Sequence, residues 1–217
     1  MENNNNNKKV IVTDNNNIFK IQVYFDGLCQ PCNPKGLACY AFIIQTDTKQ
    51  TIHSEYGLAT KPFTEGSTNN VAEYTGIIKA LRWLLENNLT NQKITIRGDS
   101  QLVIYQLRRN RKAKDQTIVP LYQKAKSLKS KFKDVTIGWI PRQINQEADR
   151  LTNKAYQDAL ERDPELLKLA SRYMATEDQL NLIKSLGIKT EKYLSKIEAN
   201  RLLFKSRGKM SSTHMQL

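Results

Sequence analysis

Three segments with the pattern of β-strands follow one another near the start of the chain, before any helical pattern appears. Residues 19–25 alternate apolar and polar side chains and end at an Asp26-Gly27 pair, which is typical of a turn. After a loop at 28–37, residues 38–46 are apolar and aromatic, and a turn near 47–50 leads to a third strand at about 51–59. Successive strands with such short connections pair antiparallel, so this part of the sequence predicts a three-stranded meander.

Helical and strand patterns alternate in the next part of the chain. The expected elements are a helix at 70–88, a strand at 93–98, helices at 100–109 and 118–132, a strand at 135–140 and a helix at about 146–161. Because the two later strands follow helical crossovers, they should run parallel to each other and to the first strand. The predicted fold class is α/β: a five-stranded mixed sheet, three strands antiparallel and then parallel strands, with helices on both faces.

The two ends of the chain differ from this central part. Residues 1–17 contain two runs of asparagine, and we expect them to be disordered. Pro164 marks a boundary, after which only helical patterns occur, and residues 164–205 are expected to form a helical appendage. Two sequences fit a capping box, Thr176 to Gln179 and Ser195 to Glu198, and Gly187 fits a helix stop. Residues 206–217 are polar and are expected to be frayed.

The chain is strongly basic, with a formal net charge of +13 and a pI near 9.6. Residues 101–135 hold ten lysines and arginines against two acids, Asp115 and Asp134. This excess favours a polyanionic partner, because basic side chains neutralise phosphates and release counterions. A merely basic and well-solvated surface is the alternative.

No apolar run approaches the roughly 20 residues that span a bilayer, so no membrane association is expected. The asparagine-rich N-terminus has no apolar region typical of a secretory signal, and we expect a cytoplasmic protein. The three cysteines, Cys29, Cys32 and Cys39, do not suggest a disulfide framework. Cys29 and Cys32 form an isolated CxxC that lacks further zinc ligands at suitable spacing, so ordinary loop thiols are the favoured interpretation over a metal or redox site.

Four acidic residues lie at the edges of the predicted elements: Asp26, Glu73, Asp99 and Asp149. Each alone has a structural explanation as a turn residue or a helix cap. Together they suggest a site, because Asp26 and Asp99 follow strands that should be neighbours, and ligands gather at the carboxyl ends of such strands. Four crowded carboxylates repel one another unless cations neutralise them. The pattern therefore predicts a metal site, and with the basic surface it predicts phosphate chemistry.

The sequences around these acids resemble those of type 1 ribonuclease H, in the archaeal and short bacterial form. The resemblance covers about residues 18–161 and is carried by four motifs in order: Tyr24-Phe25-Asp26-Gly27, residues 67–74 (STNNVAEY), residues 98–103 (GDSQLV) and residues 139–151 (WIPRQINQEADRL). It implies the ribonuclease H-like fold and an endonuclease that hydrolyses the RNA strand of RNA–DNA hybrids, leaving 5′-phosphate and 3′-hydroxyl ends.

The resemblance also implies roles for the four acids. Asp26 would bridge two metal ions, Asp149 would complete the site on the nucleophile side, and Glu73 and Asp99 would hold the ion on the leaving-group side. Magnesium suits such oxygen ligands, and manganese could substitute for it.

Substrate-binding residues are implied in the same way. Asn33, Asn69 and Asn70 would face the 2′-hydroxyls of the RNA strand, joined by Gln101, since amides both donate and accept hydrogen bonds. Thr68 would lie near the DNA phosphates. The loop before Asp149 lacks the histidine that many bacterial members carry there, and Arg142 would contact the scissile or product phosphate instead, with a solvated surface charge as the alternative.

Two further basic regions are candidates for nucleic-acid contacts. The first is a reduced binding strip formed by Arg108, Arg109, Arg111, Lys112 and Lys114. The second is the appendage with Lys184, Lys189, Lys192, Lys196, Arg201, Lys205, Arg207 and Lys209, which could instead pack on the core or recruit a protein. The sequence names no protein partner.

Three other functions stay open beside hydrolysis of hybrids. One is a non-catalytic nucleic-acid-binding module that keeps the fold. Another is a nuclease that also acts on double-stranded RNA. The last is a different enzyme of the same broad fold, such as a transposase.

Overall fold

The computed structural model describes residues 18–109 and 115–213, with side chains as far as Ser206. The disorder expected for residues 1–17 and the tip of the predicted basic strip, Arg111, Lys112 and Lys114, lie outside these residues. None of the described helices has the length and apolar character needed to cross a membrane.

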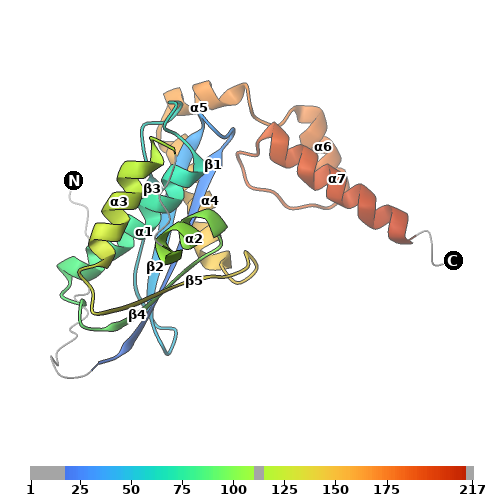
Figure 1. Ribbon diagram of the computed structural model, residues 1–217. Coiled ribbons are helices and arrows are strands. Elements are labelled where there is room, and N and C mark those ends of the chain that lie inside the picture. Colours follow the sequence, from blue (N-terminus) through green and yellow to red (C-terminus); the bar gives the residue numbers. More distant parts are fainter. Residues whose placement is uncertain (1–17, 110–114, 214–217) are drawn as a thin grey trace, which may run out of the picture.

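A five-stranded mixed sheet forms the centre of the molecule (Figure 1). Its strands are β1 (Lys20–Gln30), β2 (Leu37–Thr46), β3 (Thr51–Leu58), β4 (Lys93–Gly98) and β5 (Asp134–Trp139). They lie in the order β3-β2-β1-β4-β5. β1 pairs antiparallel with β2, and β2 with β3, whereas β4 runs parallel to both β1 and β5. The predicted topology is confirmed.

The turn expected at Asp26-Gly27 is wrong, because β1 continues through both residues to Gln30. Antiparallel pairing with β2 extends over this whole stretch, from Ile21 opposite Thr46 to Gln30 opposite Leu37. The glycine serves close packing and not a turn, since a Cβ on Gly27 would lie within 2.8 Å of Glu73 Cα.

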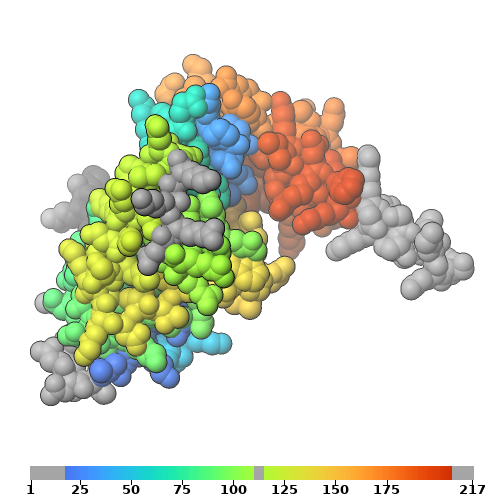
Figure 2. Space-filling view, viewed as in Figure 1, coloured from blue at the N-terminus to red at the C-terminus, as the bar shows by residue number. Residues whose placement is uncertain are grey.

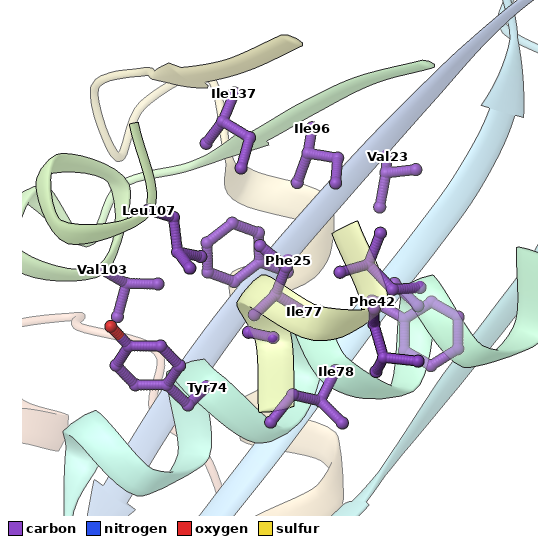
Figure 3. Close-up of a cluster of buried hydrophobic side chains, with 14 of the residues drawn as sticks. Val23, Phe25, Phe42, Tyr74, Ile77, Ile78, Ile96, Val103, Leu107 and Ile137 are labelled. Atoms are coloured by element: carbon purple, nitrogen blue, oxygen red, sulfur yellow. The ribbon is translucent and has the colours of Figure 1, made fainter. Parts of the chain in front are cut away.

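Helices cover both faces of the sheet, as predicted. α1 (Asn69–Glu86), α2 (Gln101–Arg109) and α3 (Ile118–Lys129) pack on one face, and α4 (Gln146–Arg162) packs on the other against β1, β2 and β3. The larger core lies under α1, where Phe25 sits among side chains from the sheet, α1 and α2 (Figure 3). Side chains alternate along β1, so Phe25 faces α1 whereas Tyr24 packs with Ala148 and Leu151 of α4.

The cysteines are free thiols, as expected, but only Cys32 lies in a loop. Cys29 is buried in β1, so the description as a loop thiol is wrong for it, and Cys39 is buried in β2, within the strand expected at 38–46. Burial raises the pKa of the Cys29 thiol, which keeps it protonated and unreactive near neutral pH.

Three helices follow the sheet domain: α5 (Pro164–Ser171), α6 (Glu177–Ser185) and α7 (Lys196–Thr213). α5 begins directly after α4 and packs in one apolar cluster with Leu37, Tyr156 and Leu160. α6 and α7 extend beyond the sheet and share a cluster of their own around Ile183, Leu194 and Ala199 (Figure 1). The appendage therefore consists of one helix built onto the core and a helical pair beyond it.

The local signals in this region are borne out with two exceptions. The capping box at Thr176 and Gln179 is complete, and Gly187 adopts a positive φ of 66° after α6. Ser195 accepts a hydrogen bond from the Glu198 backbone, but the Glu198 side chain binds Arg201 and does not complete a second capping box. The backbone of α7 is helical as far as Thr213, so fraying from residue 206 is wrong for that stretch.

Candidate functional site

Asp26 and Asp99 lie at the same level of the sheet because of the parallel register of β1 and β4. Tyr24 pairs with Arg97, and each acid follows its member of this pair by two residues. β4 ends at Gly98, so the edge of β1 is open on the β4 side at Asp26. Asp26 lies in the middle of β1, but the neighbouring strand β4 has already ended at this level of the sheet.

Glu73 reaches the same place from α1. The N-cap of this helix is Thr68, whose hydroxyl accepts a hydrogen bond from the backbone N–H of Val71. The absence of a side chain at Gly27 lets the backbone at Ala72 and Glu73 lie against β1. The close approach of helix and strand thus positions the carboxylate of Glu73 beside that of Asp26.

Oxygens of Asp26, Glu73 and Asp99 lie within 4.8 Å of one another. Asp26 and Glu73 are almost fully buried, with 5% and 3% of their surfaces exposed. The Oε2 atom of Glu73 is buried and has no hydrogen-bond partner. A buried carboxylate oxygen without a partner is costly unless a cation occupies the site. The donor set, its spacing and this unpaired oxygen all fit a hard divalent cation.

Asp149, in the first turn of α4, lies at the border of this cluster. Its Oδ1 accepts a hydrogen bond from Nη2 of Arg142, and its charge acts on Asp26. The Arg142 guanidinium also acts electrostatically on Asp26 and Asp99. Asp149 therefore lies next to the three clustered acids and forms an ion pair with Arg142, from the loop before α4.

Burial and the charges of neighbouring acids raise the pKa of both Asp26 and Glu73. Burial raises the pKa of Asp26 to about 7, helped by the charge of Asp99 and opposed by a hydrogen bond from Thr152. Burial raises the pKa of Glu73 well above its usual range, and the charges of Asp26 and Asp99 add to this. The site is therefore poised to exchange protons for a cation.

Two buried polar residues that sequence reasoning did not identify hold the acids in place. The Asn145 amide donates to the backbone O of Phe25 at 2.9 Å and to Asp99 Oδ1 at 2.8 Å. The Thr152 hydroxyl lies 2.8 Å from both Asp26 Oδ2 and the backbone O of Asp149, and it can donate to one of them at a time. Neither has a local signal in the sequence, because the acid that each one contacts lies more than 45 positions away in the chain.

The amides expected to read the RNA strand gather beside Glu73. The backbone N–H of Asn69 donates to Asn33 Oδ1, and the Asn69 side chain lies 3.5 Å from Glu73 Oε1. Asn70 follows in the first turn of α1, and Thr68 caps the helix. The structure thus brings Asn33, Thr68, Asn69 and Asn70 to one side of the acid cluster.

Gln101 lies on another side of the cluster, at the start of α2. It is exposed and borders a surface pocket with Leu102, Tyr105 and Trp139, and the Trp139 indole donates to the backbone O of Asp99. Arg108 and Arg109 line the same pocket. They are the described part of the predicted basic strip.

The chain is similar to several known proteins. The family model described as "Reverse transcriptase-like" matches residues 25–155. The chain is 38% identical to the Ribonuclease HI of Halobacterium salinarum over 93 residues, covering 43% of this chain and 46% of the relative. It is 35% identical over 127 residues to the Bifunctional protein Rv2228c of Mycobacterium tuberculosis, covering 58% of this chain and 33% of the relative.

Solved structures agree with these matches. The LC11-RNase H1 crystal structure in complex with an RNA/DNA hybrid is 31% identical, with a TM-score of 0.57, and covers 64% of this chain and 99% of that one. RNase H1 of Halobacterium salinarum is 29% identical, with a TM-score of 0.55, and covers 64% of this chain and 98% of that one. The chain thus spans nearly all of these structures, but less than half of the length of the curated relatives named above.

Proposed function

The chain belongs to the type 1 ribonuclease H family, and from this premise we propose that it is an endonuclease that hydrolyses the RNA strand of RNA–DNA hybrids, leaving 5′-phosphate and 3′-hydroxyl ends. The observation that carries the proposal is the cluster of Asp26, Glu73 and Asp99 with its unpaired buried oxygen. The LC11-RNase H1 structure, determined with an RNA/DNA hybrid, supports the choice of substrate.

The proposed site would take Mg²⁺, and two ions would be held by Asp26, Glu73, Asp99 and Asp149. Mn²⁺ shares the preference for oxygen ligands and is expected to substitute. When bound, the ions would supply electrostatic stabilisation for the attacking and leaving oxygens of the phosphodiester. Their charge would also offset the burial and the repulsion between acids that raise the pKa of Asp26 and of Glu73.

The protein's own contribution is to hold four acids in one arrangement before the substrate arrives. Asn145 fixes the Asp99 carboxylate relative to the backbone of β1, and Thr152 does the same for Asp26 relative to α4. Both partners are buried, so their geometry does not depend on solvent. Such fixed polar groups around metal ligands are needed for both affinity and orientation.

Arg142 is proposed to bind the scissile or product phosphate. Its guanidinium already lies against Asp149 and within electrostatic reach of the other acids, and arginine suits phosphate oxygens because it donates in a planar fork. A substrate phosphate bound there would accept hydrogen bonds from the same Arg142 guanidinium that donates to Asp149.

Selection of the RNA strand is proposed to depend on Asn33, Asn69, Asn70 and Gln101. An amide can donate to and accept from a 2′-hydroxyl, which DNA lacks. Three of the four gather on the Glu73 side of the acid cluster, where a ribose beside the scissile phosphate would lie. Thr68 is proposed to face a phosphate of the DNA strand, in addition to capping α1.

The test compares matched RNA–DNA, RNA–RNA and DNA–DNA duplexes in Mg²⁺, with EDTA and Asp26→Asn as controls. Cleavage of the hybrid alone, with 5′-phosphate products, is expected. Cleavage of double-stranded RNA at a similar rate would widen the activity, and binding without cleavage would identify a nucleic-acid-binding module instead.

We further propose residues 18–161 as the catalytic domain and 164–205 as an appendage that serves it. A cytoplasmic location stays a prediction, and the described residues do not point to a particular protein partner.

A further inference from the structure

A groove leads from the acid cluster toward the C-terminal helices. It has a volume of about 440 Å³ and begins at Arg142 and Asp149. Residues of β1 and α4 line it on one side, and residues 189–202 line it on the other. In Figure 2 the red residues of α7 stand beside the blue residues at the end of β1.

Two rows of side chains run from the catalytic acids into this groove. Along β1, Leu28 and Gln30 share the face of Asp26, because alternate residues of a strand point the same way. Along α4, Asn153 and Gln157 follow Asp149 at intervals of four residues and lie on one side of the helix. Any strand with its scissile phosphate at the acids that continues in this direction therefore enters the groove.

The far wall of the groove is fixed to the sheet domain. Both the N–H and the C=O of Tyr193 bond to the Gln157 side chain, at 3.0 and 3.5 Å. Lys192 forms an ion pair with Glu161 at the end of α4. The backbone of residues 194–196 also pairs with that of residues 173–175, on the turn that follows α5. These contacts give the wall a defined position relative to the acids.

The exposed cations of this wall are Lys189 and Arg201. Arg201 donates from Nε and Nη2 to Glu198, which leaves its remaining donors for another acceptor. Glu191 and Glu198 also border the groove, so its charge is mixed. Between residues 164 and 206, however, eight lysines and arginines outnumber five acids. The appendage therefore has a net positive charge, which attracts a polyanion.

We propose that this groove receives the cleaved strand on one side of the scissile phosphate, with Lys189 and Arg201 against its phosphates. The inference rests on the proposed function, and it gives the C-terminal helices a role in extending the substrate site beyond the sheet domain. A hybrid must then be long enough to extend from the acids into the groove before it can contact Lys189 and Arg201.

The experiment uses the full chain and two hybrids, one of about 6 base pairs, roughly 20 Å at 3.4 Å per step, and one of about 18. Lys189→Ala and Arg201→Gln are compared with Lys168→Ala, which removes an exposed charge of α5 outside the groove. For each variant, kcat and KM are measured on both hybrids. Binding to the long hybrid is also measured over a range of salt, in an Asp26→Asn background.

We expect the groove variants to raise KM on the long hybrid about 3- to 10-fold, with kcat nearly unchanged and the short hybrid unaffected. Each should also reduce the slope of log K against log salt concentration by about 1, because one fewer counterion is released on binding. Glu198→Gln should have the opposite effect and tighten binding of the long hybrid, because it frees Arg201 and removes a negative charge.

Equal effects on both hybrids, or none on either, would overturn the groove assignment. So would an effect of Lys168→Ala as large as that of the groove variants. A wild-type protein that cleaves neither hybrid contradicts the proposed function instead, and the binding measurements in the Asp26→Asn background still test the groove.

Discussion

The side-chain amide of Asn145 joins Asp99 to the backbone of β1. It donates to Asp99 Oδ1 at 2.8 Å and to the backbone O of Phe25 at 2.9 Å, at the level where β4 ends and its pairing with β1 has stopped. A side chain thus continues the connection between two strands past the last backbone pair. The position of the Asp99 carboxylate is fixed by this connection.

Asn145→Ala should lower kcat by about 10- to 100-fold and raise the Mg²⁺ concentration needed for half-maximal activity, because Asp99 loses its orienting donor. The free energy of unfolding should fall by roughly 1–3 kcal/mol, since buried acceptors lose their partner. Asn181→Ala, an exposed asparagine of α6, is the matched control. Metal-titration curves that coincide for Asn145→Ala and wild type would show that this amide does not position the acid.

Asp26→Asn should abolish turnover but stabilise the metal-free protein at alkaline pH. Because burial raises the pKa of Asp26 to about 7 from a usual value of 3.8, the folded state keeps a proton that the unfolded chain loses. Stability of the wild type without metal should therefore fall as the pH rises from about 4 to about 7, and then level off. Glu73 shifts in the same direction and adds to the trend.

The measurement is urea unfolding in EDTA at pH 5 and pH 8. Asp26→Asn should exceed the wild type by roughly 1–3 kcal/mol more at pH 8 than at pH 5. An identical pH dependence for the two proteins would mean that Asp26 is not protonated in the folded state near neutral pH.

Mg²⁺ should stabilise the wild type against heat and should do so more strongly at pH 8 than at pH 6. At the lower pH protons compete for the same carboxylates, so binding is weaker. The melting temperature is recorded with increasing Mg²⁺, with Asp26→Asn as the variant expected to respond little. A shift of equal size in both proteins would place the bound ion away from this cluster.

Gly27→Ala should separate α1 from β1 and remove activity together with stability. A Cβ at this position conflicts with the backbone at Ala72 and Glu73, which is rigid, and such overpacking costs about 1–3 kcal/mol or more. Gly138→Ala in β5 is the matched control, because a Cβ there meets nothing within 4 Å. If Gly27→Ala retained wild-type stability and kcat, the close approach of helix and strand would not position Glu73.

The sheet could be predicted from the sequence because its pattern is local. Alternation along 19–25, short connections to 38–46 and 51–59, and helical crossovers before the later strands determine the pairing and direction of the strands. The same local reasoning failed at Asp26-Gly27. Two residues typical of a turn lie inside a strand there, because tertiary packing against α1 requires a glycine at that point.

The gathering of Asp26, Glu73 and Asp99 could be predicted because Asp99 follows a strand parallel to β1 and Glu73 lies near the start of a helix, although Asp26 lies within its strand. The residues that position these acids could not be predicted. Asn145 and Thr152 act through contacts with residues more than 45 positions away in sequence, and such contacts leave no periodic signal. The groove was also beyond prediction, because it depends on how residues 189–202 dock onto α4.

The location of Asp26 within β1 has a consequence for how such a protein can diversify. β2 pairs with β1 on both sides of this residue, so the acid cannot shift without breaking the centre of the sheet. New preferences for length or type of nucleic acid must then arise in segments at the margin, such as the loop at 31–36 and the helices after Pro164. In this arrangement the segments around the acids can change the nucleic acid that is bound without moving the acids themselves.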